Sequence, residues 1–400
     1  MDIVLYDDAV ARTFQPFALT RPAGELRAGA LLVRERWALA LGAPVTAHVC
    51  AAHLAGFEEP DACPVYTRDL AEGSWLVNGR FAPQLARIPD ANVLEAGGRV
   101  VALRLDSHLK LADLDGGELT LDLLARKAVG STARISGWWM DEVWDLVRYL
   151  VPMLEHDIPV LGTWCRERAP DGAIVVGDHP VFVEEGAEVE PSVCFDVTAG
   201  PVLLRRDSHI QAFTRLTGPL YVGVGSSVTT DRVASSSIGD TCKVHGEVSN
   251  TIFIGHANKG HDGFVGHSIL GRWVNLGAGT ITSNLKNTYG TVSLWTPSGV
   301  RDTGMQFLGT LFGDHAKTGI GLKLTTGTVL GAGANVYGSA MPPKAVAPFS
   351  WGEAEAFSRY RLDKFLDVAQ RMMARRQVTL SAGARAQLTA AFDARWPGVE

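Results

Sequence analysis

The sequence lacks the features that place a protein in a membrane or direct it for export. It contains no run of about 18 apolar residues, the length that a transmembrane helix requires. Its N-terminus, Met-Asp-Ile-Val-Leu-Tyr-Asp-Asp, has neither basic residues nor a long apolar core, so it does not read as a signal peptide. These absences predict a cytoplasmic protein with no membrane partner.

Cysteine pairs and clustered basic charge are also missing. The five cysteines are scattered and form no Cys-x-x-Cys, which argues against a disulfide framework and a zinc ribbon. The net charge is −6, and no basic stripe is interleaved with aromatic residues, so nucleic acid is not an expected partner. With 46% hydrophobic and 20% charged residues, the composition is that of a soluble globular protein. A length of 400 residues predicts two or three domains.

What the sequence does contain is a short repeat. Aliphatic-Gly pairs recur five and six residues apart between Val265 and Gly279, and looser copies extend in both directions. A spacing near six is typical of hexapeptide β-helix repeats, in which each short strand buries one aliphatic side chain and turns on a small residue. Such coils stack into a prism. Functional side chains are therefore expected on its outer surface or between prisms.

Changes in hydrophobic pattern predict the domain organisation. Residues 1–155 read as an α/β domain, 156–172 as a linker, 173–348 as the β-helix and 349–400 as a helical C-terminal tail that caps the stack. The segment Asn284–Leu308 interrupts the repeat and is expected to leave one coil as an excursion.

Within the flanking segments, the pattern predicts several helices and buried strands. The expected helices span Leu26–Leu41, Met140–Leu154, Glu353–Arg376 and Ala382–Ala394. The expected strands span Asp2–Tyr6, Trp75–Val77 and Val100–Leu103.

The strongest candidate site lies in the repeat. In a triangular coil of about eighteen residues, positions one turn apart lie above each other, so His261, Asn275 and Asn284 are predicted to line one groove. A neutral imidazole is a natural base near pH 7 for an amine or hydroxyl. An Asn side chain offers both a donor and an acceptor to a sugar or an amide.

Two motifs in this region resemble a known family. Lys259-Gly-His-Asp-Gly-Phe-Val-Gly and Val274-Asn-Leu-Gly-Ala-Gly-Thr-Ile-Thr-Ser-Asn284 are similar to the acetyltransferase half of bifunctional GlmU-type enzymes, which make UDP-N-acetylglucosamine from glucosamine-1-phosphate. Leu311-Phe-Gly-Asp-His-Ala-Lys-Thr-Gly-Ile-Gly is similar to archaeal sugar-1-phosphate nucleotidylyltransferase/acetyltransferases.

The resemblance implies a left-handed parallel β-helix that forms homotrimers, with an amino-sugar phosphate and acetyl-CoA as substrates. It implies that His261 is the general base. The implied substrate contacts are Phe264, Asn275, Asn284 and Lys286, and the implied acetyl-CoA contacts are Ala278, Ile320 and Ala332. Ser249 and Phe264 stand where the family has Lys and Tyr, which favours a different amino sugar as the acceptor.

The N-terminal segment Arg12-Thr-Phe-Gln-Pro-Phe-Ala-Leu-Thr-Arg-Pro22 resembles sugar-phosphate nucleotidylyltransferases, but the Gly-x-Gly that cradles phosphate in them is missing. The resemblance implies nucleotide or phosphate contacts from Arg12, Arg21, Arg27 and Asn78. It implies Asp141 as a ligand of Mg²⁺, which is needed only if this half is active. Arg80 replaces the family's second metal-binding Asp and would repel the ion. This half is therefore interpreted as degenerate.

Three functions remain open from the sequence. The first is an acetyl-CoA-dependent N-acetyltransferase acting on an amino-sugar phosphate in nucleotide-sugar synthesis. The second is an active sugar-1-phosphate nucleotidylyltransferase that takes a nucleoside triphosphate through an altered metal site. The third is a non-catalytic scaffold or ligand sensor, which the set of His261, Asn275 and Asn284 disfavours.

Overall fold

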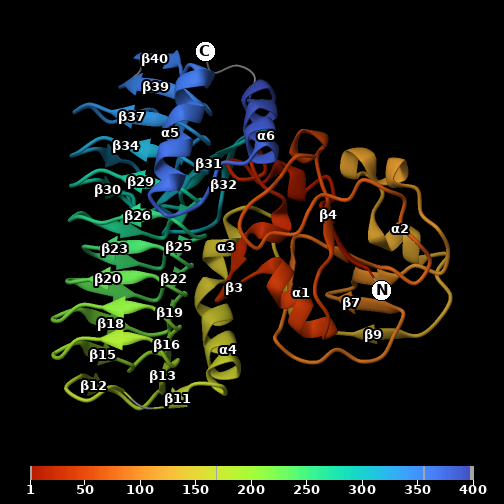
Figure 1. The fold of residues 1–400 in the computed structure, drawn as a ribbon, viewed down its shortest axis with the longest axis horizontal. Coiled ribbons are helices and arrows are strands. Elements are labelled where there is room, and N and C mark those ends of the chain that lie inside the picture. Colours follow the sequence, from red (N-terminus) through yellow and green to blue (C-terminus); the bar gives the residue numbers. More distant parts are fainter. Residues whose placement is uncertain (1, 168, 355, 397–400) are drawn as a thin grey trace. The chain divides into compact units, whose positions relative to one another are not determined.

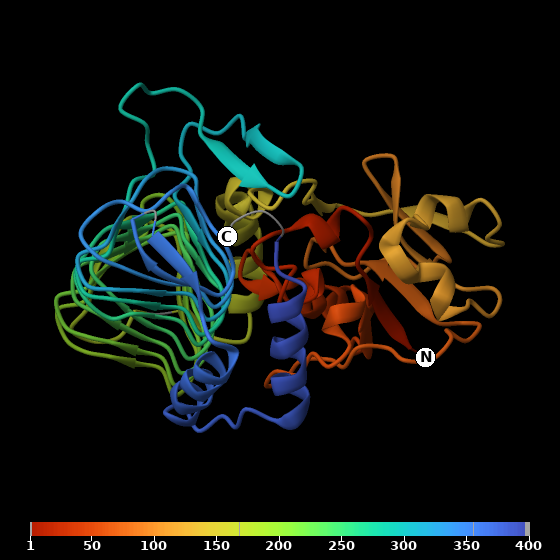
Figure 2. The ribbon, with the colours of Figure 1, turned by 90° about the horizontal axis from the view of Figure 1, so that it is seen from above.

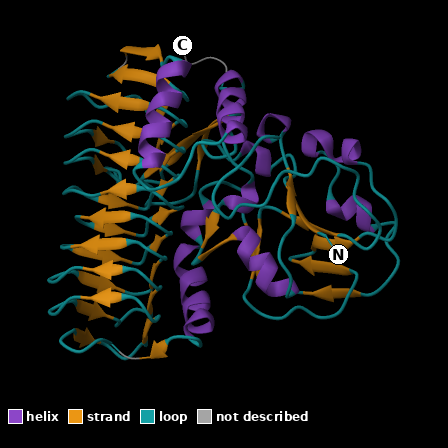
Figure 3. Cartoon of the chain, viewed as in Figure 1, coloured by secondary structure: helices purple, strands orange, loops and turns teal. Residues whose placement is uncertain are grey.

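The computed structural model describes residues 2–167, 169–354 and 356–396. The chain forms two compact units: one comprises Met1–Asp145 and Met373–Arg395, and the other comprises Leu146–Met372 and Trp396–Glu400. The helices and short strands of each unit are distinguished in Figure 3. Within the described residues, no helix is long and apolar enough to span a bilayer.

The N-terminal unit is built on one mixed sheet. In spatial order its strands are β4 (Ala47–Val49), β1 (Ile3–Tyr6), β5 (Trp75–Asn78), β8 (Arg99–Arg104), β7 (Val93–Ala96) and β9 (Thr132–Arg134). Strand β1 pairs in parallel with both β4 and β5, and all four of its residues are buried. A strand covered on both faces is expected to be an unbroken apolar run, as β1 is. The three strands expected in this half are confirmed.

Short elements surround this sheet. They are the 3-10 helices η1 (Ala11–Thr13), η2 (Ala23–Glu25), η3 (Ala52–Leu54) and η4 (Leu111–Gly117), the strands β2 (Arg27–Ala28), β3 (Leu31–Leu32), β6 (Phe81–Pro83) and β10 (Gly137–Trp139), and the helices α1 (Val33–Leu41), α2 (Leu121–Ala125) and α6 (Ala382–Asp393).

The helix expected over Leu26–Leu41 begins only at Val33, because the residues before it form the antiparallel β2–β3 pair. It ends at Leu41, and Gly42, which follows, has a φ of 68°, a backbone conformation that suits glycine. The helix expected from Ala382 is confirmed as α6.

The second unit is a parallel β-solenoid, whose strands Figure 1 shows stacked in chain order. Among the described residues its three sheets contain ten, six and ten strands. The first side contains β11 (Arg166–Glu167), β13 (Val181–Val183), β16 (Val202–Leu204), β19 (Leu220–Val222), β22 (Ser237–Ile238), β25 (Ile252–Phe253), β28 (Ile269–Leu270), β33 (Thr310–Phe312), β36 (Thr328–Leu330) and β38 (Ala345–Val346).

The second side contains β12 (Ile174–Val176), β15 (Cys194–Asp196), β18 (Arg215–Thr217), β21 (Arg232–Ala234), β24 (Val248–Ser249) and β27 (Val265–Gly266), and then the pair β30 (Ile281–Thr282) and β35 (Lys323–Leu324). The third side contains β14 (Glu188–Val189), β17 (His209–Ile210), β20 (Ser227–Thr229), β23 (Lys243–His245), β26 (Asn258–Lys259), β29 (Asn275–Leu276), β34 (Lys317–Thr318), β37 (Asn335–Tyr337), β39 (Ser350–Glu353) and β40 (Ala356–Arg359).

The repeat follows from one inward aliphatic residue per strand. On successive coils these side chains stack into a single buried core, as Leu216, Val233, Val248 and Val265 do at 0% exposure. No coil could bury this row alone, so stacking supplies the apolar contact. The β-helix predicted from the aliphatic-Gly spacing is confirmed, while its handedness stays a prediction.

The excursion predicted at Asn284–Leu308 is also confirmed. Neighbouring coils are about 17 positions apart, as for Asn258 and Asn275, but the coil that contains this segment returns after 42, as for Ser268 and Thr310. The extra residues include an antiparallel hairpin of β31 (Ser293–Thr296) and β32 (Gly299–Asp302). Figure 2 shows this hairpin outside the superimposed coils.

The segment after the last coil differs from the helix expected over Glu353–Arg376. Strands β39 and β40 form an antiparallel hairpin on the third side, and the helix α5 spans only Leu362–Ala374. Phe357 lies on β40 and packs against the solenoid core. Some of the apolar residues whose spacing suggested a helix are therefore strand residues. Phe365 of α5 contacts Phe349 at 5.0 Å, so α5 does cover the end of the stack.

The helices between the two halves are α3 (Asp145–Arg148) and α4 (Leu150–Gly162). Helix α4 continues through Pro159, inside the segment expected as a linker. The boundary between the compact units lies after Asp145.

Candidate functional site

His261 lies in the turn between β26 and β27, and it is exposed. Within the described part of the chain, its imidazole makes no hydrogen bond or ion pair. Its backbone carbonyl, in contrast, accepts a hydrogen bond from the ammonium of Lys259. The turn is thus held from inside the prism while the ring remains available to a ligand.

The coil register places His261, Ala278 and Ile320 at corresponding positions on three successive coils. The carbonyl of Asp262 accepts a hydrogen bond from the residue after Ala278 (2.9 Å), and the carbonyl of Ala278 accepts one from the residue after Ile320 (2.7 Å). Ile320 is 79% exposed. These three residues, called here the His261 column, form a strip parallel to the solenoid axis with an imidazole at one end. Ala332 is fully buried and does not join them.

His261 and Asn284 lie at opposite edges of the second side: His261 precedes β27, and Asn284 follows β30. Asn284 Nδ2 donates to Nδ1 of His267 (2.9 Å), and His267 stacks on Phe307 at 5.2 Å. The Phe264 ring lies over Gly266, where a Cβ would come within 2.4 Å of the ring and 2.7 Å of Asn284 Nδ2. The Phe264 ring therefore covers the outer surface of the second side between His261 and Asn284. The absence of a side chain on Gly266 provides the space for this ring.

Burial lowers the pKa of His267 to about 4. The imidazole is consequently neutral near pH 7. Since Nδ1 accepts from Asn284, the proton of the neutral ring is assigned to Nε2.

Asn275 lies on the third side, where its Oδ1 accepts from Asn258 (2.7 Å). No hydrogen bond joins His261, Asn275 and Asn284 to one another within the described residues. The three residues lie on neighbouring coils and on adjacent sides of the same prism. Lys286 is half-buried in the excursion.

The structure reveals one further pair that the sequence did not suggest. Nε2 of His245 lies 2.9 Å from Oδ1 of Asp262, next to His261, and its Nδ1 lies 3.0 Å from the Thr230 hydroxyl. This chain of contacts crosses three coils. Only the exact coil register could have revealed it, because residue types alone do not show which turns meet.

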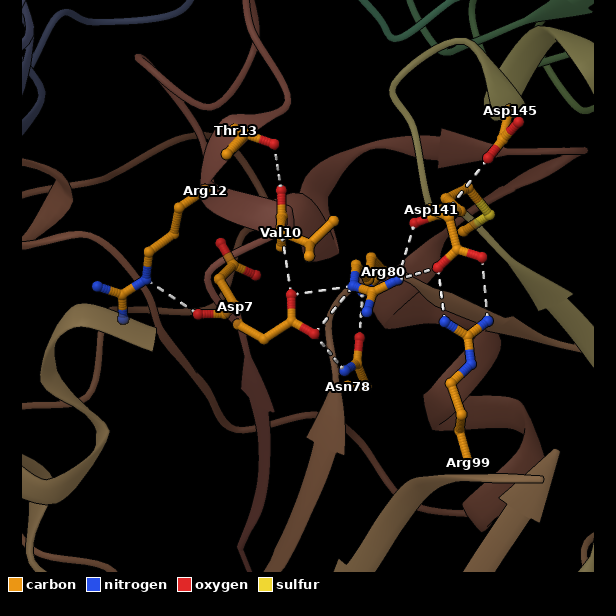
Figure 4. Close-up of polar contacts among 12 residues, drawn as sticks. Asp7, Val10, Arg12, Thr13, Asn78, Arg80, Arg99, Asp141 and Asp145 are labelled. Carbon is orange, nitrogen blue, oxygen red and sulfur yellow. Dashed lines mark hydrogen bonds and ion pairs between the residues drawn. The ribbon is translucent and has the colours of Figure 1, made fainter. Parts of the chain in front are cut away.

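In the N-terminal unit, polar side chains gather where β1 and β5 end, as Figure 4 shows. Arg80 Nε lies 2.9 Å from both carboxylate oxygens of Asp8, and Arg80 Nη1 donates to Oδ1 of Asp141 at 2.6 Å. Asn78 donates to Asp8 (3.1 Å) and accepts from the amide of Arg80 (2.9 Å). The second guanidinium, from Arg99, binds both oxygens of Asp141 at 2.6 and 3.1 Å.

Asp7 is buried beside this cluster. Its Oδ2 accepts from the amide of Ala23 (2.9 Å), whereas Oδ1 is buried with no hydrogen-bond partner among the described residues. Burial raises the pKa of Asp7 to about 6. A Cβ on Gly79 would lie 2.4 Å from Oδ1, so glycine is required there.

The three arginines expected to contact phosphate all bind protein groups. Arg12 donates to the backbone carbonyls of Asp7 (3.0 Å) and Leu114 (3.2 Å). Arg21 forms a two-pronged pair with Glu59 at 3.1 and 2.8 Å, and Arg27 donates to the carbonyl of Ala30. Arg21 and Arg27 are both buried. Their guanidiniums hold the loops after β1 together.

The residues at Asp141 do not fit Mg²⁺. Hydrogen bonds from Arg99, followed by those from Arg80, hold the pKa of Asp141 below its usual range. Both carboxylate oxygens therefore face guanidiniums, whereas Mg²⁺ requires oxygen ligands in an octahedron. In the part of the chain that the structure describes, no three His, Cys, Asp or Glu side chains are grouped to hold a metal.

The two units fall in different structural classes: the N-terminal unit is similar to sugar nucleotidyl transferases, and the second unit is a parallel β-solenoid of the hexapeptide-repeat type. Residues 3–164 match the family described as "Sugar nucleotidyl transferase", so this part of the chain is similar to that family. The predicted resemblance to GlmU-type proteins is confirmed by the relatives that follow.

The chain is 26% identical over 285 residues to the bifunctional sugar-1-phosphate nucleotidylyltransferase/acetyltransferase of Sulfurisphaera tokodaii, which covers 68% of this chain and 62% of that protein. It is 25% identical over 262 residues to the bifunctional protein GlmU of Methanocaldococcus jannaschii, covering 61% and 56%. The chain thus matches about three fifths of the length of these relatives. A hexapeptide transferase family protein from Anaplasma phagocytophilum aligns with 55% of this chain and 98% of its own, at 13% identity and a TM-score of 0.27.

Proposed function

We propose that the solenoid transfers an acetyl group from acetyl-CoA to the amine of an amino-sugar phosphate, as a step of nucleotide-sugar synthesis. The observation that supports this most directly is the His261 column. An exposed imidazole, without a hydrogen-bond or ion-pair partner in the described part of the chain, stands at one end of a strip that continues over Ala278 and the protruding Ile320. A base beside an apolar strip suits an amine acceptor and a thioester on a long, flexible arm.

In this proposal His261 acts as general base. As the amine nitrogen attacks the thioester carbonyl, a new N–C bond forms and His261 accepts the ammonium-derived proton. The C–S bond then breaks, and the proton passes to the departing thiolate, so that CoA leaves as the thiol. General base catalysis of this kind typically contributes about 10²–10⁴-fold. Backbone amides of the coil would stabilise the oxyanion.

The acceptor sugar would lie across the second side, next to His261. The ring of Phe264, spread over Gly266, offers an apolar surface for a sugar face. The amides of Asn275 and Asn284 offer hydrogen bonds beyond those they make to Asn258 and His267. Lys286 would approach the phosphate from the excursion.

A basic cavity of about 460 Å³ supports the position of the CoA phosphates. It is lined by Trp351, Ser358, Arg359, Tyr360, Arg361, Lys364, Asp367, Val368 and Arg371. Trp351 belongs to the ladder that continues from Asn275 through Lys317 and Asn335. At about 4.8 Å per coil, three coils separate Trp351 from Asn275 by about 14 Å. An extended pantetheine arm can span such a distance.

The assay that tests this proposal is release of free thiol from acetyl-CoA with a panel of amino-sugar phosphates. The wild type should release thiol with at least one acceptor, and His261→Ala should lose about 10²-fold or more in kcat. His209→Ala is the matched control, because His209 lies three coils away on the same side and pairs with Glu190. Near wild-type turnover of His261→Ala would remove His261 from the mechanism. We also propose a homotrimer in the cytoplasm, which sedimentation and fractionation can test.

The match of residues 3–164 favours a second candidate activity, nucleotidyl transfer by the N-terminal unit. There the phosphate of a sugar-1-phosphate would attack the α-phosphorus of a nucleoside triphosphate and expel pyrophosphate. The test is pyrophosphate release with each of four nucleotides, with and without Mg²⁺. Release would establish the activity, and its absence for all four would count against it. If neither half turned over, a scaffold or ligand sensor would be the remaining interpretation.

A further inference from the structure

A lysine occupies the interior of the prism directly before the His261 turn. On the third side, Val228 pairs with Val244 and Val244 pairs with Lys259, so the three share one inward row. Val228 and Val244 are buried at 0% and 1% exposure, and Lys259 is 2% exposed. A cation in a row otherwise used for aliphatic packing needs partners, since burying an unpaired charge is strongly unfavourable.

The ammonium of Lys259 finds its partners in two turns. Its Nζ donates to the carbonyl of His245 at 2.7 Å and to the carbonyl of His261. A Cβ on Gly246 would lie 2.9 Å from Nζ, so the glycine lets the ammonium approach the turn. Burial lowers the pKa of Lys259 to about 8. Lys259 thereby ties the His261 turn to the preceding coil.

A second lysine, Lys317, donates to the carbonyl of His315 (3.0 Å) within its own coil, and two other turns of the solenoid use a hydroxyl instead. The Thr214 hydroxyl donates to the carbonyl of Gln211 (2.7 Å), and the Thr280 hydroxyl donates to that of Gly277 (2.8 Å). The Thr280 hydroxyl also lies 2.7 Å from the Thr318 hydroxyl of the next coil, but neither threonine carries a charge. Lys259, in contrast, joins the backbone carbonyls of two coils through one ammonium group. The His261 turn is therefore held by a charge-assisted tether, and such hydrogen bonds are roughly twice as strong as neutral ones.

We propose that Lys259 is the positioning residue of His261: it fixes the His261 carbonyl from inside the prism and so aims the imidazole outward beside Ala278. The kinetic consequence of this inference rests on the proposed acetyl transfer. The tether, meaning the two hydrogen bonds from Lys259 Nζ, does not depend on that function. Removal of the ammonium leaves two inward carbonyls without a donor. The turn then loses its anchor, and the base moves relative to the acceptor amine.

The kinetic test uses Lys259→Met in the full chain. We expect kcat for acetyl transfer to fall by about 10²-fold, the size of effect that a displacement of about 1 Å can produce. The KM for acetyl-CoA should stay within about twofold, because Ala278 and Ile320 lie on later coils. Val244→Ala is the matched control: it removes packing from the same inward row but leaves both carbonyls bonded. An equal loss of kcat in both variants would mean general destabilisation and would overturn the proposal.

Hydrogen exchange gives a readout that is independent of activity. The amide of Gly279 donates to the carbonyl of Asp262, next to His261, and should exchange faster in Lys259→Met but not in Val244→Ala. Absence of acetyl transfer in the wild type would reject the proposed function, while faster exchange would still support the tether. If Lys259→Met does not fold, Lys259→Gln keeps an amide donor and should retain an intermediate exchange rate. Wild-type exchange and wild-type kcat in a folded variant would refute the positioning role.

Discussion

Arg80 Nη1 lies 2.6 Å from Oδ1 of Asp141, while Nε of the same guanidinium contacts both oxygens of Asp8 at 2.9 Å. One side-chain cation thus bridges two carboxylates that come from the end of β1 and from the residues after β10. The Trp139 ring lies 4.9 Å from the Arg80 guanidinium and 3.8 Å from that of Arg99. The cluster neutralises itself without an added ion.

Removal of this guanidinium should expose a latent cation site. We expect Arg80→Ala to bind Mn²⁺ in a calorimetric titration of the full chain, and the wild type to bind at least tenfold more weakly. The reason is that Asp8 loses its charged partner, and Asp141 keeps only one of its two guanidinium partners, that of Arg99. Without metal, the same change should destabilise the unit by up to roughly 3–5 kcal/mol, because the buried carboxylate of Asp8 loses its charged partner. Arg104→Ala, an exposed arginine on β8, is the control. Equal Mn²⁺ affinity in wild type and Arg80→Ala would contradict this prediction.

The His261 column predicts that a substitution on it can weaken the binding of acetyl-CoA without lowering the stability of the fold. Ile320 is 79% exposed, so Ile320→Asp should leave the thermal unfolding temperature unchanged. Burial of an isoleucine side chain contributes about 1.5–3 kcal/mol. The KM for acetyl-CoA should therefore rise by about tenfold or more, and kcat at saturation should change little. Steady-state kinetics decide this, and an unchanged KM would place the thioester elsewhere.

His267 predicts a pH dependence of stability. Its pKa is lowered to about 4 in the folded chain, against about 6.5 when unfolded. Between these values the unfolded state binds more protons, so the contribution is complete above about pH 6.5 and is lost as the pH falls toward 4. The full effect is up to about 3 kcal/mol. Urea unfolding at pH 7 and pH 5 should show a smaller difference for His267→Gln than for the wild type. Identical differences would show that His267 does not titrate as described.

The sequence predicted the solenoid well because its information is local. Each coil repeats the same aliphatic-Gly pattern, and the interruption of that pattern marks the excursion. The helix expected from Glu353 was wrong at its start because β40 is short and its apolar residues match a helical spacing by chance. Handedness and assembly involve contacts that no periodicity encodes.

The candidate sites were only partly visible. His261 was found through its motif, but Lys259 was passed over because its role depends on facing inward. Alignment of Val244 with Lys259 in the coil register would have shown a cation in an aliphatic row. Arg80 and Asp141 are 61 positions apart in the sequence. Both residues were identified from the sequence, but the ion pair between them was not predicted.

The detour after Asn284 has a consequence for variation of this protein. Ile269 pairs with Leu311 and Leu270 with Phe312, so the ladder resumes in register after the inserted hairpin. Lengthening a surface loop costs little, only about 0.6 kcal/mol for each doubling. The insert can therefore be replaced, shortened or lengthened while the coils that follow it keep their register. What changes is the position of the Phe307 ring that stacks on His267, so under the proposed acetyl transfer this insert is where acceptor preference would diverge.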